Sequence, residues 1–264
     1  MVNINDMKTE HVDFNSVDIL ELIFDRQKQL MEKYKTEPVW KTINSVEAQW
    51  LIRRFTKYTL EEIGEAFEEV EKRLWYEINN SNFLNYELRT KTFNSSQFKK
   101  FLTKDEQDHL YEEIADSLHF YVEKLLISNV SDPDILYQYI EEYIKEKTWI
   151  EETIMSYQDL EKVVLKYSLP SFEEKNKEWY SIGDVYQAIW TFNTYINVAD
   201  NFLRSKEWQK DQKQVYIEWY QKALAVSLYY YVILLLVLGI DTETITDLYL
   251  RKHKVNQFRI NSNY

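Results

Sequence analysis

Residues 51–71 read LIRRFTKYTLEEIGEAFEEVE, and this stretch decides the fold. Six of its side chains recur at steps of four, three, four, three and four residues: Leu51, Phe55, Tyr58, Glu62, Glu65 and Glu69. These steps place side chains on one face of an α-helix. The stretch therefore predicts a long helix with one continuous stripe, which begins apolar and becomes acidic halfway along.

Helical spacing of apolar residues extends over most of the chain on either side of this stretch. Breaks are predicted at the Asn- and Ser-rich residues 79–100, at Pro133 and at Pro170. Between the breaks, we expect helices over residues 16–35, 45–78, 103–128, 132–167, 182–207, 215–238 and 241–254.

The composition excludes the main alternatives to an all-α fold. The 264 residues include only three glycines and three prolines, whereas phosphate-binding loops need clustered glycines and β-sandwiches need frequent turns. Cysteine is absent, which excludes disulfides, thiolate metal sites and a cysteine nucleophile, and fits a reducing setting. We predict one all-α domain over residues 1–264, with about six to eight helices.

The formal charge of −12 argues against nucleic acid as a partner, because an acidic surface repels phosphate. A nucleotide would need a metal ion to mediate its binding. The first residues, MVNINDMKTEHVD, do not resemble a signal peptide. Residues 223–240 are apolar and just long enough to span a membrane. We expect a buried central helix there rather than a membrane span.

The acidic half of the stripe is a candidate metal site. Two carboxylates about 4 Å apart repel by roughly 4 kcal/mol at an effective dielectric constant near 20, and a cation would relieve this repulsion. Oxygen-only ligands suit a hard ion such as Mg²⁺. The spacing leaves a second interpretation open, in which the helix emerges into solvent near Glu61.

A second acidic pair, Glu113 and Asp116, lies three residues apart in EEIADSLHF. A competing polar row on the same predicted helix could instead be its solvated side: Glu112, Asp116, His119 and Glu123. His119 is interpreted as a structural residue rather than a ligand. The spacing of His11, His109 and His253 shows no pattern.

Together, Glu62-x-x-Glu65 and Glu113-x-x-Asp116 resemble the ExxE…ExxD signature of the all-α nucleoside triphosphate pyrophosphatases. Within these, the chain is most similar to the dimeric dUTPases of phages, some bacteria and trypanosomatids. The similar segments occur in order over most of residues 20–260: TLEEIGEAFEE, EEIADSLHFYVE, NVADNFLRSKEW and LGIDTETITDLYLRKHKVNQFR.

The resemblance implies a helical bundle of that family, with a core over about 16–128 and 180–255 and a helical insertion at 129–179. It implies Mg²⁺-dependent hydrolysis of dUTP, or also of dUDP or dCTP, to the monophosphate and pyrophosphate. The four carboxylates would hold two or three Mg²⁺ ions, and Glu62 would also orient or deprotonate the attacking water. A homodimer in the cytoplasm, of the host cell if phage-encoded, is implied as well.

The resemblance also assigns substrate-binding residues: Gln27, Asn201, Arg204, Lys206, Lys252, Asn256 and Arg259. Gln27 would contact the base, and the others phosphate, sugar or metal-bound water. The chain departs from the family where Glu207 follows Lys206 and where His253 follows Lys252. Leu30 and Met31 occupy the region in which the family often has an asparagine for the base. These departures leave the identity of the base open.

Three other functions remain as alternatives. The first keeps the chemistry but takes dCTP as the substrate. The second is a non-catalytic helical protein that binds a nucleotide or a partner through aromatic surface, which the intact carboxylate set disfavours. The third is a membrane-anchored protein built on residues 223–240.

Overall fold

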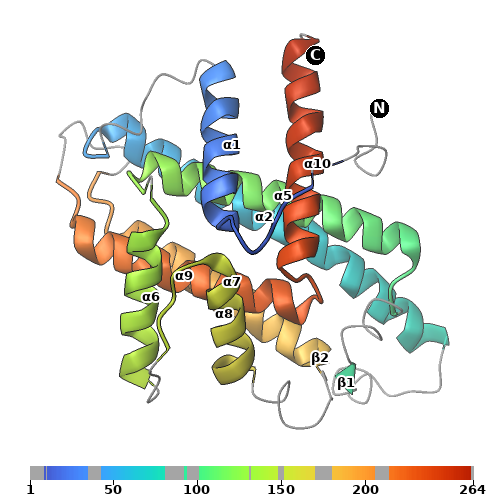
Figure 1. Ribbon diagram of the computed structural model, residues 1–264. Helices are drawn as coiled ribbons and strands as arrows, with labels where there is room; N and C mark the ends of the chain where they lie inside the picture. Colours follow the sequence, from blue (N-terminus) through green and yellow to red (C-terminus); the bar gives the residue numbers. More distant parts are fainter. Residues whose placement is uncertain are drawn as a thin grey trace.

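The computed structural model describes residues 9, 11–34, 43–80, 92–93, 101–130, 132–147, 152–169, 180–205 and 214–262 (Figure 1). Eight α-helices lie in these residues: α1 (Ile19–Lys33), α2 (Val46–Asn80), α5 (Lys104–Ile127), α6 (Asp134–Lys147), α7 (Tyr157–Val163), α8 (Ile182–Asn201), α9 (Ile217–Val237) and α10 (Thr242–Asn261). A π-helix, η3 (Val164–Ser168), continues α7. The strands β1 (Thr92–Phe93) and β2 (Tyr180–Ser181) form one short antiparallel pair. The predicted all-α class and helix number are confirmed.

Two helix pairs organise the bundle. The two longest helices, α2 and α5, pack along each other, and α8 packs on α9. The helices α1 and α10 contact each other and both contact α5, and Figure 1 shows them standing across the α2–α5 pair. The helix α6 packs on α9, and α7 contacts α1, α9 and α10. Nearly all of their buried apolar residues belong to one hydrophobic cluster. The division into a core and an insertion stays a prediction.

Side chains at the helix ends explain several of the boundaries. Ser45 Oγ accepts a hydrogen bond from the backbone N–H of Ala48 (3.1 Å) at the start of α2. Thr103 and Glu106 form a reciprocal capping box at the start of α5. Gly239 has a φ of 74° directly after α9, a left-handed conformation that glycine adopts without strain.

Three predicted boundaries were wrong. The helix expected over 132–167 is two helices, because Ser156 caps a new one and Glu141 accepts a hydrogen bond from the Ile154 N–H (3.1 Å). The helix expected to reach residue 207 ends at Asn201, and the last helix continues beyond 254 to Asn261. Most of the loop expected at 79–100 lies outside the described residues.

The apolar helix α9 is buried in the bundle, as predicted. It is the one described helix that is long and apolar enough to cross a membrane, and 78% of its most apolar window is buried inside the protein. Its polar groups have partners there: Ser227 Oγ bonds Tyr121 Oη (2.7 Å), and Tyr231 Oη bonds Ser117 Oγ (2.8 Å). Hydroxyl pairs of this kind are typical of a helix whose neighbours are other protein segments.

A buried ion pair joins three helices at one end of the α2–α5 pair. The Lys124 ammonium on α5 is fully buried and contacts the Asp200 carboxylate on α8 and Thr56 Oγ1 on α2 (2.5 Å). Burial lowers the pKa of Lys124, and the charge of Asp200 opposes this effect. The pair fixes α8 against α2 and α5, the two helices that carry the four predicted metal ligands.

Replacing Asp200 by Ala should lower the free energy of unfolding by about 3–5 kcal/mol, because it leaves the Lys124 charge buried without its counter-ion. The double variant Lys124→Met/Asp200→Leu should cost less than Asp200→Ala alone. Urea denaturation measures both. The control is Asp159→Ala, which removes the largely exposed ion pair to Lys162 and should cost at most about 1 kcal/mol. Equal losses for Asp200→Ala and Asp159→Ala would contradict the role of the buried pair.

Candidate metal centre

The packing of α2 on α5 brings three predicted carboxylates together. Glu62 and Glu65 on α2 and Glu113 on α5 each offer an oxygen atom, and these oxygens lie within 4.8 Å of one another. Glu113 is buried, Glu62 is half-buried and Glu65 is exposed. The cluster therefore opens to solvent on the Glu65 side.

The acidic end of α2 does not emerge into solvent after Glu61, so that interpretation was wrong. Ile63, Val70 and Leu74 are buried on the same stretch of helix, and Glu69 is only 8% exposed. This end of the helix keeps packing against α5 because its apolar residues continue at helical spacing through the acidic segment. The apolar half of the stripe also packs on α5, where the ring centroid of Tyr58 lies 5.2 Å from that of Phe120.

The closeness of the carboxylates changes the pKa of Glu62. Burial raises the pKa of Glu62 to about 8, helped by a hydrogen bond with Glu113 and by the charges of Asp116, Glu113 and Glu65. A carboxyl group with this pKa holds its proton at neutral pH. The proton relieves the repulsion that a bound cation would otherwise relieve.

Asp116 lies beside the cluster but is paired with a lysine. Its carboxylate is 2.6 Å from Lys252 Nζ on α10, and Lys252 Nζ is also 3.0 Å from Glu112. Burial raises the pKa of Asp116 to about 6 despite the opposing charge of Lys252. Thus the structure brings three of the four predicted metal ligands together. It places Lys252, predicted to contact substrate, as a buried counter-ion of the fourth.

The polar row of α5 faces inward, so its interpretation as a solvated side was wrong. The helices α1 and α10 cover this face. His119 is buried, its Nδ1 lies 2.8 Å from the Ala115 carbonyl oxygen, and its ring stacks 4.3 Å from that of Tyr249. Burial lowers the pKa of His119 to about 3, so the imidazole is neutral. These contacts support the structural role predicted for it.

His109 was missed as a contact of the acidic stripe. Its Nδ1 lies 3.2 Å from Glu69 Oε1, and its Nε2 lies 3.1 Å from Glu113 Oε1. The imidazole thus links α2 to α5 next to the cluster. One signal was present in the sequence, because His109 precedes Glu113 by four residues and so shares its helix face.

A cavity of about 450 Å³ adjoins the carboxylates. Five predicted site residues line it: Gln27, Glu62, Asp116, Asn256 and Arg259. Its other lining residues are mostly apolar or aromatic, with one further carboxyl: Leu30, Met31, Tyr34, Phe55, His119, Phe120 and Glu123. Arg259 is exposed, whereas Gln27 is fully buried. The cavity therefore combines carboxylates, an exposed cation and aromatic walls, as small-molecule sites commonly do.

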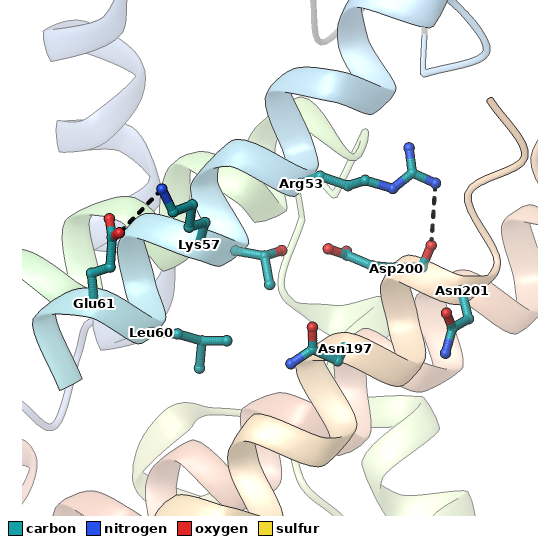
Figure 2. A pocket seen from close by; sticks show the side chains of 8 residues that line it. Arg53, Lys57, Leu60, Glu61, Asn197, Asp200 and Asn201 are labelled. Carbon is teal, nitrogen blue, oxygen red and sulfur yellow. Dashed lines mark hydrogen bonds and ion pairs between the residues drawn. The ribbon is translucent and has the colours of Figure 1, made fainter. Parts of the chain in front are cut away.

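Two other predicted substrate residues, Asn201 and Arg204, lie elsewhere. Asn201 lines a different pocket of about 560 Å³ between α2 and α8, together with Arg53, Lys57 and Asp200 (Figure 2). The Arg204 guanidinium lies 4.7 Å from the centre of the Tyr216 ring. Neither residue lines the cavity beside Glu62. Lys206 lies outside the described residues.

No family model matches the chain, and neither a curated protein nor a solved structure shows significant similarity to it.

The residues of the cluster fit a hard divalent cation. All three donors are carboxylates, and the raised pKa of Glu62 shows that burial and the neighbouring carboxylates disfavour a further negative charge there, which a cation would offset. Mg²⁺ prefers oxygen ligands and commonly uses one or two carboxylates together with water and substrate phosphates. The exposed side at Glu65 leaves room for such additional ligands.

In the absence of metal, ionisation of Glu62 should destabilise the fold as the pH rises. The pKa of Glu62 is raised from 4.5 to about 8. The free energy of unfolding should therefore begin to fall near pH 4.5, and the fall should be complete above pH 8. Glu62→Gln should therefore have a melting temperature that falls less than that of the wild type across this window. At pH 8, Mg²⁺ at a hundred times its Kd should raise the wild-type melting temperature by about 5–10 °C and that of Glu62→Gln much less.

Glu68→Gln is the matched control, because this exposed glutamate pairs with Lys72 outside the cluster (3.5 Å). It should follow the wild type in both measurements. If Glu62→Gln and the wild type respond equally to pH and to Mg²⁺, the carboxylates do not form a metal centre.

Proposed function

We propose that the protein is a Mg²⁺-dependent nucleoside triphosphate pyrophosphatase that acts on a pyrimidine deoxynucleotide, dUTP or dCTP. The observation that carries the proposal is the position of Glu62, which belongs to the carboxylate cluster and also lines the 450 Å³ cavity. One residue thus belongs both to the candidate metal centre and to the candidate nucleoside pocket.

The cavity supports a nucleoside as ligand. Phe55 and Phe120 line it with their rings 6.1 Å apart, and such faces pack well on a flat base. Gln27 and Glu123 supply hydrogen-bonding groups on the same cavity. Arg259 is exposed where the cavity meets solvent and matches the charge of a phosphate group.

Each residue of the site has a separate role in the proposed reaction. Glu62, Glu65 and Glu113 would hold Mg²⁺, which when bound neutralises phosphate charge and lowers the pKa of a bound water. Glu62 loses its proton when a cation binds the cluster, and its carboxylate would then orient or deprotonate the attacking water, because it borders both the cluster and the cavity. Lys252 holds Asp116 in place through its 2.6 Å ion pair and thereby fixes the cavity wall beside Glu62. A homodimer and a cytoplasmic location stay predictions from the resemblance.

Replacing Glu62, Glu65, Glu113 or Asp116 by Ala should reduce kcat for dUTP and dCTP at saturating Mg²⁺ by at least 100-fold, since each change removes a carboxylate from the centre or from the cavity wall beside it. Pyrophosphate release over the full set of deoxynucleoside triphosphates measures this, and inorganic phosphate release is followed in parallel. Pyrophosphate should be the product.

Glu68→Ala is the control, because its side chain is exposed on another face of α2. It should keep nearly full activity. Full activity of Glu65→Ala or Glu113→Ala, or the absence of pyrophosphate release from every deoxynucleoside triphosphate, would rule out the proposed function.

A further inference from the structure

Lys252 on α10 places a buried ammonium group against the fourth predicted metal ligand. Its Nζ atom lies 2.6 Å from a carboxylate oxygen of Asp116 and 3.0 Å from one of Glu112, both on α5. The Lys252 side chain is only 4% exposed, whereas those of Asp116 and Glu112 are 23% and 39% exposed. A cation of the protein itself is therefore buried against two carboxylates that solvent can reach.

The packing of α10 sets the position of this ammonium group. The helix contacts α1 and α5, and Tyr249 Oη on α10 donates to Gln27 Oε1 on α1 (2.8 Å). Leu248 and Val255, which precede and follow Lys252 on the helix, are buried. Burial alone would lower the pKa of Lys252, but the two carboxylates raise it above its usual value. Lys252 is therefore charged at neutral pH and is held on the α10 side of Asp116.

Asp116 also lies close enough to the carboxylate cluster to interact with it. After burial and the hydrogen bond with Glu113, the charge of Asp116 is the next cause of the raised pKa of Glu62. A second divalent ion at Asp116 would therefore relieve repulsion if no other cation were there. Lys252 already supplies a positive charge, and it would repel a metal ion at the same carboxylate, because charges are weakly screened in a partly buried site.

We propose that Lys252 takes the place of a second metal ion, so that the nucleotide-free protein binds one divalent cation, at Glu62, Glu65 and Glu113. This number differs from the two or three Mg²⁺ ions that the sequence resemblance implies. The inference rests on the proposed function only through its metal centre, and it does not depend on which nucleotide is hydrolysed.

The test counts bound Mn²⁺ by electron paramagnetic resonance in the nucleotide-free protein at pH 8. The buffer contains about 0.15 M KCl, which screens weak binding to surface carboxylates. The wild type should bind one Mn²⁺ ion per chain. Lys252→Ala removes the ammonium group and leaves Asp116 and Glu112 beside the space that it occupied. Bound Mn²⁺ should therefore double, to two ions per chain.

Two further variants show whether the second ion is bound at Asp116. The double variant Lys252→Ala/Asp116→Asn also removes the carboxylate, and it should bind one ion again. The matched control is Lys72→Ala, because Lys72 Nζ likewise contacts two carboxylates, Glu68 (3.5 Å) and Glu69 (2.9 Å). It should bind one ion, as the wild type does.

Lys252→Met removes the charge but keeps the apolar stem, and it tests the inference even if Lys252→Ala does not fold. It should also bind two ions. If these counts are observed but no deoxynucleoside triphosphate is hydrolysed, the proposed function fails and the inference stands.

The inference is overturned if the wild type binds no Mn²⁺ or more than one ion per chain. It is also overturned if every folded variant at Lys252 stays at one ion, or if Lys72→Ala gains an ion as well. A second ion that persists in Lys252→Ala/Asp116→Asn would equally contradict it.

Discussion

The repulsion between carboxylates held together by the packing of α2 on α5 is the constraint on which the site depends. Apolar residues of both helices are buried along this contact, so the helices approach closely. This close approach brings together the carboxylates of Glu62, Glu65 and Glu113, which repel one another. One oxygen of each lies within 4.8 Å of the others. Without a cation, the raised pKa of Glu62 is the physical response. Hydrophobic burial thus stabilises an arrangement of charges that favours metal binding.

Ion pairs and hydrogen bonds around the three carboxylates hold the neighbouring helices in place. Lys252 pairs with Asp116 and Glu112 on the α10 side of α5. His109 links Glu69 to Glu113 on the α2 side. At one end of the α2–α5 pair, the buried pair of Lys124 and Asp200 ties α8 to the same two helices. These contacts give partners to the neighbouring carboxylates Glu69, Glu112 and Asp116, while Glu62 and Glu65 meet Glu113 in the group to which a cation can bind.

Local patterns in the sequence predicted much of this arrangement. The stripe from Leu51 to Glu69 predicted the acidic face of α2, and the scarcity of glycine and proline predicted the all-α class. The inward position of Glu123 could not be predicted, because it depends on α1 and α10 covering α5, and those contacts join residues far apart in the chain. For the same reason, spacing alone did not reveal that Lys252 would pair with Asp116 or that Asn201 would line another pocket. Local periodicity defines the faces of a helix, whereas tertiary packing decides which face is buried.

The central claim is that Glu62, Glu65 and Glu113 bind a divalent cation between α2 and α5. Anomalous diffraction from crystals soaked with Mn²⁺, a hard cation that stands in for Mg²⁺, tests it most directly. The account predicts a peak between these three carboxylates, with metal–oxygen distances of about 2.0–2.2 Å, and predicts that the peak disappears in Glu113→Gln. A wild-type map without a peak at this position, at saturating Mn²⁺, would contradict it.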